Sequence, residues 1–164
     1  MNIISINDSK KYIHYGSEYF DKNRFVEIKN CHNPWNKPTP NSGLWGTPIG
    51  SAYNYNWHDW CLDNHYHIER LDKCFRFKLK DGSNVIKIHS NKDLDDILEA
   101  GLCCYSGRHP YLTDDDVYFD FEQLVKDGYD AIEVYVHSNR IYMSLYGWDC
   151  DSILVLNPDC IIEL

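Results

Sequence analysis

Short stretches of alternating apolar and polar residues recur along this chain and predict β-strands. In CFRFKLK, residues 74–80, Phe75, Phe77 and Leu79 alternate with basic side chains, which is the pattern of a half-buried strand. The turn sequence DGSN follows, so VIKI at 85–88 is expected to be the hairpin partner of that strand. Further strands are predicted at residues 12–17, from Gly43 onward, and at 131–136, 141–146, 152–158 and 160–164.

Three other stretches have the three- to four-residue apolar spacing of short amphipathic helices. In the middle one, Ser90 or Asn91 is the expected N-terminal cap, and Gly101 ends the helix. The helices are predicted within residues 51–63, 90–101 and 120–128, the last with Phe121, Leu124 and Val125 facing inward.

Two stretches rich in Pro, Asn, Gly and Asp, residues 30–43 and 101–116, are expected to be irregular loops. Many short strands with few helices indicate the α+β class. A length of 164 residues suits one domain with a hydrophobic core and is short for two, so a single domain over residues 1–164 is predicted.

The charge and cysteine content limit the possible partners. The chain has 16 basic and 25 acidic residues, a net charge of -9, which disfavours nucleic-acid binding and is compatible with a basic protein partner. No apolar run is long enough to span a membrane, and the N-terminus lacks the pattern of a signal peptide. The seven cysteines have no disulfide-framework spacing, so we expect reduced thiols and a cytoplasmic protein.

Candidate chemistry begins with two acids in front of an apolar run, in WDCDSILVLNP. Asp149 and Asp151 would point the same way if the chain were already extended there. A D-x-D of this kind can bind a divalent metal on a nucleotide sugar, but the enzymes that use it need a larger nucleotide-binding fold. On their own, the two acids are better explained as polar residues of a turn before the strand.

Other candidates are also ambiguous when each is considered singly. Taken alone, His14 is better explained as a strand histidine and Trp45 as a core residue, and Ser51 could be a helix cap. Zinc could accept donors from WHDWCLDNHYH, but the donors lack the paired spacing of structural zinc sites, so no metal is predicted. The donors considered there are His58, Cys61, His65 and His67.

Taken in order, these stretches resemble the ADP-ribosyltransferase family. HYGS, with His14 and Gly16 around an inserted Tyr15, is similar to the family's first-strand H-G-[ST]. GLWGTPIGS is similar to the second motif, with Trp45 in the place of the aromatic residue that flanks nicotinamide, and Ser51 at the matching spacing. CDSILVLNP is similar to the third motif, in which a catalytic Glu precedes an apolar strand.

The resemblance implies an ADP-ribosyltransferase-like fold, a split pair of β-sheets that holds NAD as a substrate. Asp151 occupies the position of the catalytic Glu, one methylene shorter, and Asp149 is the alternative acid. ADP-ribose would be transferred to a macromolecule, with a protein as the expected target, and the family suggests an anti-defence effector of a phage or a toxin. The residues implied in NAD binding are His14, Tyr15, Gly16, Trp45, Thr47, Ser51 and Tyr146.

A second hypothesis is a protein of the same fold that has lost catalysis. The shorter acid and the inserted Tyr15 favour such a binding or inhibitory protein, which would act through its acidic surface rich in Tyr and Trp. A third is hydrolysis of NAD without any acceptor.

Overall fold

The computed structural model describes residues 10–31, 36–50, 55–105 and 116–164. Predictions on the other residues lie outside this part of the chain, and Ser51 is among them.

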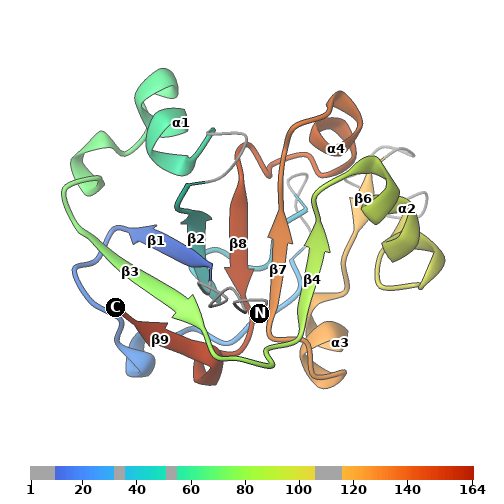
Figure 1. Ribbon diagram of the computed structural model, residues 1–164, viewed down its shortest axis with the longest axis horizontal. Helices are drawn as coiled ribbons and strands as arrows, with labels where there is room; N and C mark the ends of the chain where they lie inside the picture. The colour runs from blue at the N-terminus through green and yellow to red at the C-terminus, as the bar shows by residue number, and fades with distance from the viewer. Residues whose placement is uncertain (1–9, 32–35, 51–54, 106–115) are drawn as a thin grey trace, which may run out of the picture.

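A mixed β-sheet organises the structure (Figure 1). Among the described residues it has seven strands in the order β4-β7-β8-β2-β1-β3-β9, with a separate two-stranded sheet of β5 and β6. The strands are β1 (Lys11–Tyr15), β2 (Leu44–Pro48), β3 (Cys74–Leu79), β4 (Val85–Ile88), β5 (Cys104–Tyr105), β6 (Val117–Tyr118), β7 (Ala131–Val134), β8 (Ser152–Val155) and β9 (Ile161–Glu163).

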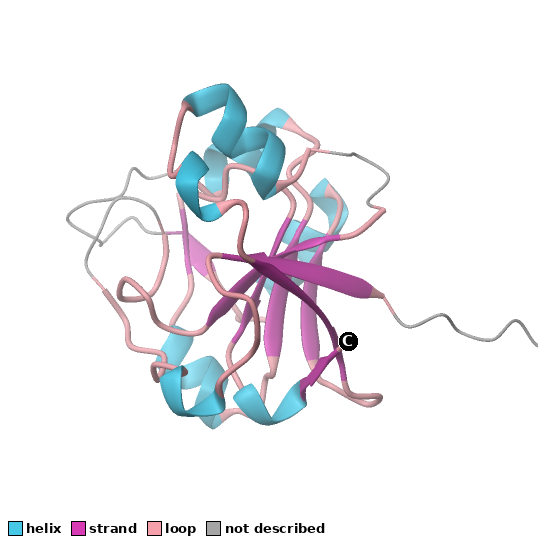
Figure 2. Ribbon diagram, turned by 90° about the vertical axis from the view of Figure 1, so that its left-hand side faces the viewer, coloured by secondary structure: helices cyan, strands magenta, loops and turns pink. Residues whose placement is uncertain are grey.

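The large sheet has two arms that meet at a short pairing of β1 with β2. That pairing registers Tyr12 with Pro48 and Ile13 with Thr47. One arm is the antiparallel set β1, β3 and β9, and the other contains β2, β8, β7 and β4. Figure 1 shows the first arm running obliquely to the second, and Figure 2 shows the strands strongly twisted, with helical turns beyond both ends of the sheet. The α+β class is confirmed.

The helices are α1 (Trp57–Asn64), α2 (Asn91–Glu99), α3 (Phe121–Lys126) and α4 (Asn139–Ser144), with 3-10 turns η1 (Lys22–Arg24), η2 (Ile68–Arg70) and η3 (Pro158–Cys160). Helices α1, α2 and α3 form where the apolar spacing predicted them; α2 begins at the predicted cap Ser90, whereas the N-cap of α1 is Asn56. The Ser90 side chain accepts a hydrogen bond from the backbone of Asp93, and Gly101 follows the helix with φ of 73°. Val125 was predicted to face inward but is 38% exposed.

The strand predicted at residues 141–146 is wrong, because this segment belongs to helix α4 and the turn after it. Ser138 caps the helix by accepting a hydrogen bond from the backbone of Ile141. Ile141 and Leu145 lie four residues apart and are both fully buried. That spacing places them on one face of a helix. In a strand, successive side chains would point to opposite faces, and every second residue would be buried.

The hairpin predicted between β3 and β4 is also wrong. Strand β4 pairs in parallel with β7, with Ile86 opposite Ile132, while β3 pairs with β1 and β9. Ile86, Ile88, Ile132 and Val134 are all buried in one apolar cluster. The turn after β3 therefore carries the chain from one arm of the sheet to the other, where burial of β4 against β7 decides its partner.

Alternation along the central strands directs side chains into two separate hydrophobic clusters. On β8, Leu154 belongs to one cluster, whereas Ile153 and Val155 belong to the other. On β7, Glu133 takes a position on the face of Ala131, and its side chain is fully buried. Both faces of the sheet are therefore covered, and a polar side chain buried on either face needs a hydrogen-bond partner.

Candidate functional site

The three strands that carry or follow the sequence motifs are neighbours in the sheet. Strand β8 pairs with β2, with Leu154 opposite Trp45, and β2 pairs with β1, with Thr47 opposite Ile13. Segments more than a hundred residues apart in the chain therefore meet at one place.

Two cavities flank this junction. The larger, called here the cleft, has a volume of about 680 Å³ and is lined by Ile13, Tyr15 and Thr47 from β1 and β2. The smaller has a volume of about 510 Å³ and is lined by Leu44 and by Gly16, among others. His14, Trp45 and Asn41 line both. Because neighbouring side chains on a strand point to opposite faces, β1 and β2 separate the two cavities.

Aromatic side chains of α1 and the segment after it form one wall of the cleft. The rings of Trp57 and Trp60 stack with centroids 5.0 Å apart and an angle of 11° between their planes. Tyr66 packs edge-on against both. The sequence predicted a helix within residues 51–63, but it did not indicate Trp57 or Trp60 as residues of the site.

His14 is held in one orientation at the border of the two cavities. Its Nδ1 lies 2.6 Å from the carbonyl oxygen of Trp45, so Nδ1 carries a proton that it donates to this oxygen. The ring packs against Phe75, with centroids 5.1 Å apart. Burial lowers the pKa of His14, although the hydrogen bond to Trp45 opposes this shift. A neutral ring leaves Nε2 as an acceptor for a ligand hydroxyl.

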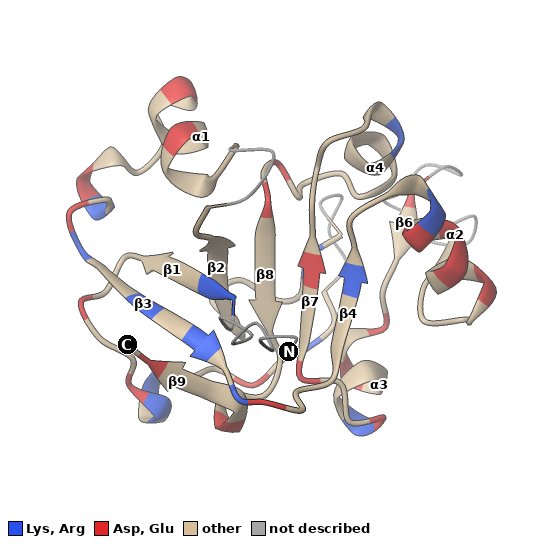
Figure 3. Ribbon diagram, viewed as in Figure 1, with Lys and Arg blue, Asp and Glu red and all other residues tan. Residues whose placement is uncertain are grey.

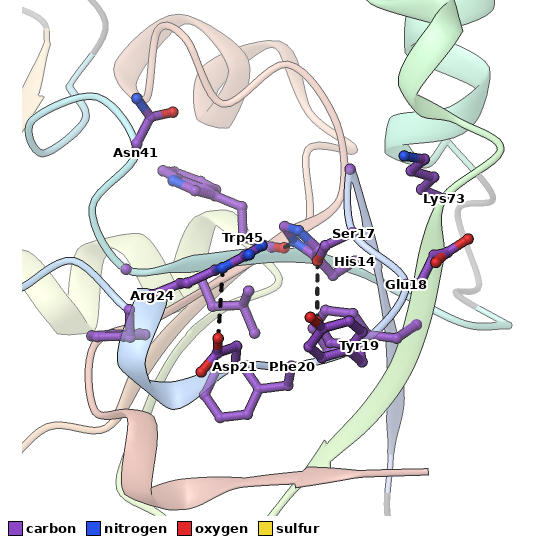
Figure 4. A pocket seen from close by; sticks show the side chains of 15 residues that line it. His14, Ser17, Glu18, Tyr19, Phe20, Asp21, Arg24, Asn41, Trp45 and Lys73 are labelled. Atoms are coloured by element: carbon purple, nitrogen blue, oxygen red, sulfur yellow. Dashed lines mark hydrogen bonds and ion pairs between the residues drawn. The ribbon is translucent and has the colours of Figure 1, made fainter.

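Gly16 lies at the smaller cavity, shown with its lining residues in Figure 4. Its φ of 113° suits glycine, and its N–H donates to the carbonyl of Lys73 at 2.7 Å. This N–H is therefore already used in pairing. In the same cavity Arg24 and Asp21 form an ion pair, at 3.6 Å.

The two acids predicted as catalytic residues occupy different environments. Asp151 is 1% exposed, and its carboxylate accepts a hydrogen bond from the backbone N–H of Val136 at 2.9 Å. Its carbonyl accepts from the Thr47 hydroxyl at 2.8 Å, and Asp151 is absent from the described lining of both cavities. Asp149, by contrast, lines the cleft. Geometry therefore favours Asp149 over Asp151 as the acid that a ligand can reach.

The remaining predicted residues lie at varying distances from the cleft. Tyr15 lines it, and its ring lies 5.8 Å from that of His58; burial is the main cause that raises the Tyr15 pKa. Tyr146 is 45% exposed and belongs to neither described lining. Ser51 is outside the described residues. In the part of the chain that is described, no three His, Cys, Asp or Glu side chains gather as a metal site.

Two cations line the cleft that sequence reasoning did not identify, Lys37 and Arg70. Lys37 belongs to the Pro- and Asn-rich stretch that was predicted only as a loop, and no motif marks either residue. The Lys37 ammonium lies 5.5 Å from the centroid of the Trp45 ring.

Comparison of the chain with family models, with curated proteins and with solved structures finds no match. None of the helices in the described residues is long and apolar enough to cross a membrane.

Proposed function

We propose that this protein is an NAD-dependent ADP-ribosyltransferase that modifies a macromolecular target, most simply a protein, and that NAD binds in the cleft. The observation that carries the proposal is the convergence of three motif segments there. Tyr15 on β1, Trp45 and Thr47 on β2, and Asp149 before β8 line the same cavity, and His14 lies at its border. The cleft volume of about 680 Å³ is in the range of small-molecule and cofactor sites, about 300–1,000 Å³.

The chemistry requires a carboxylate beside a ribose. When the bond between ribose C1′ and the nicotinamide nitrogen breaks, its electrons remain on nicotinamide, and positive charge develops on the ribose. The Asp149 carboxylate would stabilise this charge through the ribose hydroxyls while the acceptor attacks C1′ and releases its proton to water. One such contact contributes about 3–4 kcal/mol to transition-state stabilisation in other enzymes.

The neighbouring side chains would orient the donor. Trp45 and Tyr15 offer aromatic surfaces for the nicotinamide and adenine rings. His14 offers its Nε2 as an acceptor for a hydroxyl, since its Nδ1–H is bound to the Trp45 carbonyl. Gly16 would not contact NAD in this arrangement, because it lines the smaller cavity and its N–H is paired with the carbonyl of Lys73.

The test is transfer of label from radiolabelled NAD to macromolecules in a cell lysate. Asp149→Asn should reduce transfer about 100- to 1,000-fold, the cost of removing one preorganised electrostatic contact. Asp81→Asn, on the exposed turn after β3, is the matched control and should transfer like the wild type. Asp151→Asn, which keeps an acceptor for the N–H of Val136, tests the acid implied by the resemblance. Unchanged transfer by Asp149→Asn would refute the role of Asp149.

A non-enzymatic binding protein of the same fold is the second candidate. The position of Asp151 favours it, because the residue that corresponds to the catalytic Glu is buried and bonded to Val136. Absence of NAD binding by calorimetry, together with absence of label on any macromolecule, would decide for this alternative.

A further inference from the structure

Lys37 is a basic residue that lines the cleft. Its ammonium lies 5.5 Å from the centre of the Trp45 ring, and its side chain lines the same cavity as Asp149. Burial lowers the pKa of Lys37, and the nearby negative charge of Asp149 opposes that shift only in part. A partly desolvated ammonium gains from an additional anion beside it.

The backbone before Lys37 is fixed in place. Asn36 is 4% exposed, and its carbonyl accepts a hydrogen bond from Nε1 of Trp148 at 3.0 Å. The Asn36 amide also donates to the carbonyl of Val117. Trp148 directly precedes Asp149, so this contact joins the loop of Lys37 to the segment of the acid. The backbone at the base of the Lys37 side chain is thereby held in place before any ligand arrives.

The charge balance of the cleft differs from that of the whole chain. Acidic residues exceed basic ones by 25 to 16 in the sequence, and Figure 3 marks acidic positions on α1 and α2 at the periphery. In the described lining of the cleft, however, Lys37 and Arg70 face the single carboxylate of Asp149. Cations concentrated in a concave site of an otherwise acidic protein favour an anionic ligand there.

We propose that Lys37 binds the diphosphate of a nucleotide in the cleft, with Arg70 contributing from the side of α1 and η2. An ammonium group is a point charge that suits phosphate oxygens, and that of Lys37 lies at the cleft, over the ring of Trp45. This inference rests on the proposed function, because NAD supplies the diphosphate. It adds the residue that would hold the centre of the dinucleotide.

The experiment is calorimetry with two probes, ADP-ribose, which contains the diphosphate, and nicotinamide riboside, which lacks it. Lys37→Met keeps an unbranched apolar side chain of similar length and removes the charge. It should weaken ADP-ribose binding about 10- to 100-fold, the usual effect of one charge-assisted hydrogen bond, and leave nicotinamide riboside binding unchanged. Lys126→Met, on the exposed side of α3, is the matched control and should bind both probes like the wild type.

The outcomes separate this inference from the proposed function. Equal ADP-ribose affinity of Lys37→Met and the wild type would overturn the role of Lys37 and leave the proposed function standing. Equal loss of both probes, with unchanged thermal unfolding, would also overturn it, because the lysine would then shape the cleft. If the wild type bound neither probe, both proposals would fall. ADP-ribose binding that depends on Lys37, without transfer of label to any macromolecule, would support the role of Lys37 and refute the proposed transferase activity.

Discussion

Replacement of Glu133 by Gln should destabilise the protein strongly, because this fully buried carboxylate has three hydrogen-bond donors. The ammonium of Lys10 lies 2.8 Å away, the hydroxyl of Tyr12 2.5 Å and Nε2 of His89 2.5 Å. Burial alone would raise the pKa of Glu133, but the bonds from His89, Lys10 and Tyr12 outweigh this, and the pKa is lowered. Glu133 is therefore ionised in the folded protein at neutral pH.

The expected loss is about 3 kcal/mol in the free energy of unfolding. Breaking a buried ion pair by removing one partner costs about 3–5 kcal/mol, and we take the lower end because the Lys10 and His89 side chains are 37% and 31% exposed. Both can turn toward water when the carboxylate is gone. Gln keeps the shape of Glu133 but replaces one acceptor oxygen with an NH₂ group, which cannot accept a hydrogen bond from the surrounding donors. In a domain of this size the loss corresponds to a decrease of about 6–12 °C in Tm.

Urea unfolding followed by far-UV circular dichroism measures this loss, with Glu99→Gln on the exposed end of α2 as the matched control. Because the folded pKa of Glu133 is lowered, its contribution is complete above the unfolded value of 4.5 and is lost as pH falls through the folded pKa. The difference between wild type and Glu133→Gln should therefore shrink in acid. A loss below about 1 kcal/mol at neutral pH would refute the reasoning.

Two further changes test the packing around the junction of β1 and β2. Burial lowers the pKa of His14 below 6.5, so as pH falls through 6.5 the unfolded chain takes up a proton before the folded one does, and stability decreases. His14→Gln should remove part of this decrease. The measurement is the urea midpoint of both proteins at about pH 7.5 and 5.5. Gly46→Ala should cost about 1–3 kcal/mol in the same assay, since the added methyl would lie 2.8 Å from the Phe77 ring and 3.2 Å from the Ile153 side chain; a midpoint within error of the wild type would contradict this.

Local structure was predictable where sequence period and burial agree. Phe75 and Phe77 alternate with basic residues, and both are buried on β3. Helix α2 begins after the predicted cap Ser90 and ends before Gly101. In such segments the secondary structure is determined by residues that are close together in the sequence.

Strand partners could not be predicted in this way. Strand β4 finds its partner in β7, more than forty residues later, because Ile86 and Ile132 fill the same apolar cluster. The turn sequence after β3 predicts that the chain changes direction there, but it does not determine which strand the next one pairs with. Likewise, Lys37 reaches the cleft because Asn36 is bonded to Trp148, a contact across 112 residues. No local pattern encodes that contact.

The paired acids show where sequence periodicity misleads and what the structure adds. Asp149 and Asp151 would share a direction on an extended chain, but the backbone bends at Cys150 and Asp151, and β8 begins only at Ser152. The two side chains therefore separate, and Asp149 lines the cleft while Asp151 turns inward.

Asp151 is then held by contacts with three separate segments of the chain. Its carboxylate accepts from Val136, its carbonyl from the hydroxyl of Thr47, and its N–H donates to the carbonyl of Tyr55 at 3.0 Å. These contacts fix the chain two residues after Asp149, so under the proposed mechanism the acid at the cleft would need little rearrangement when charge develops on the ribose. An inward acid that anchors an outward one accounts for two carboxylates at the start of a core strand. Asp151→Asn should consequently impair transfer less than Asp149→Asn, and the reverse order would return the catalytic role to Asp151.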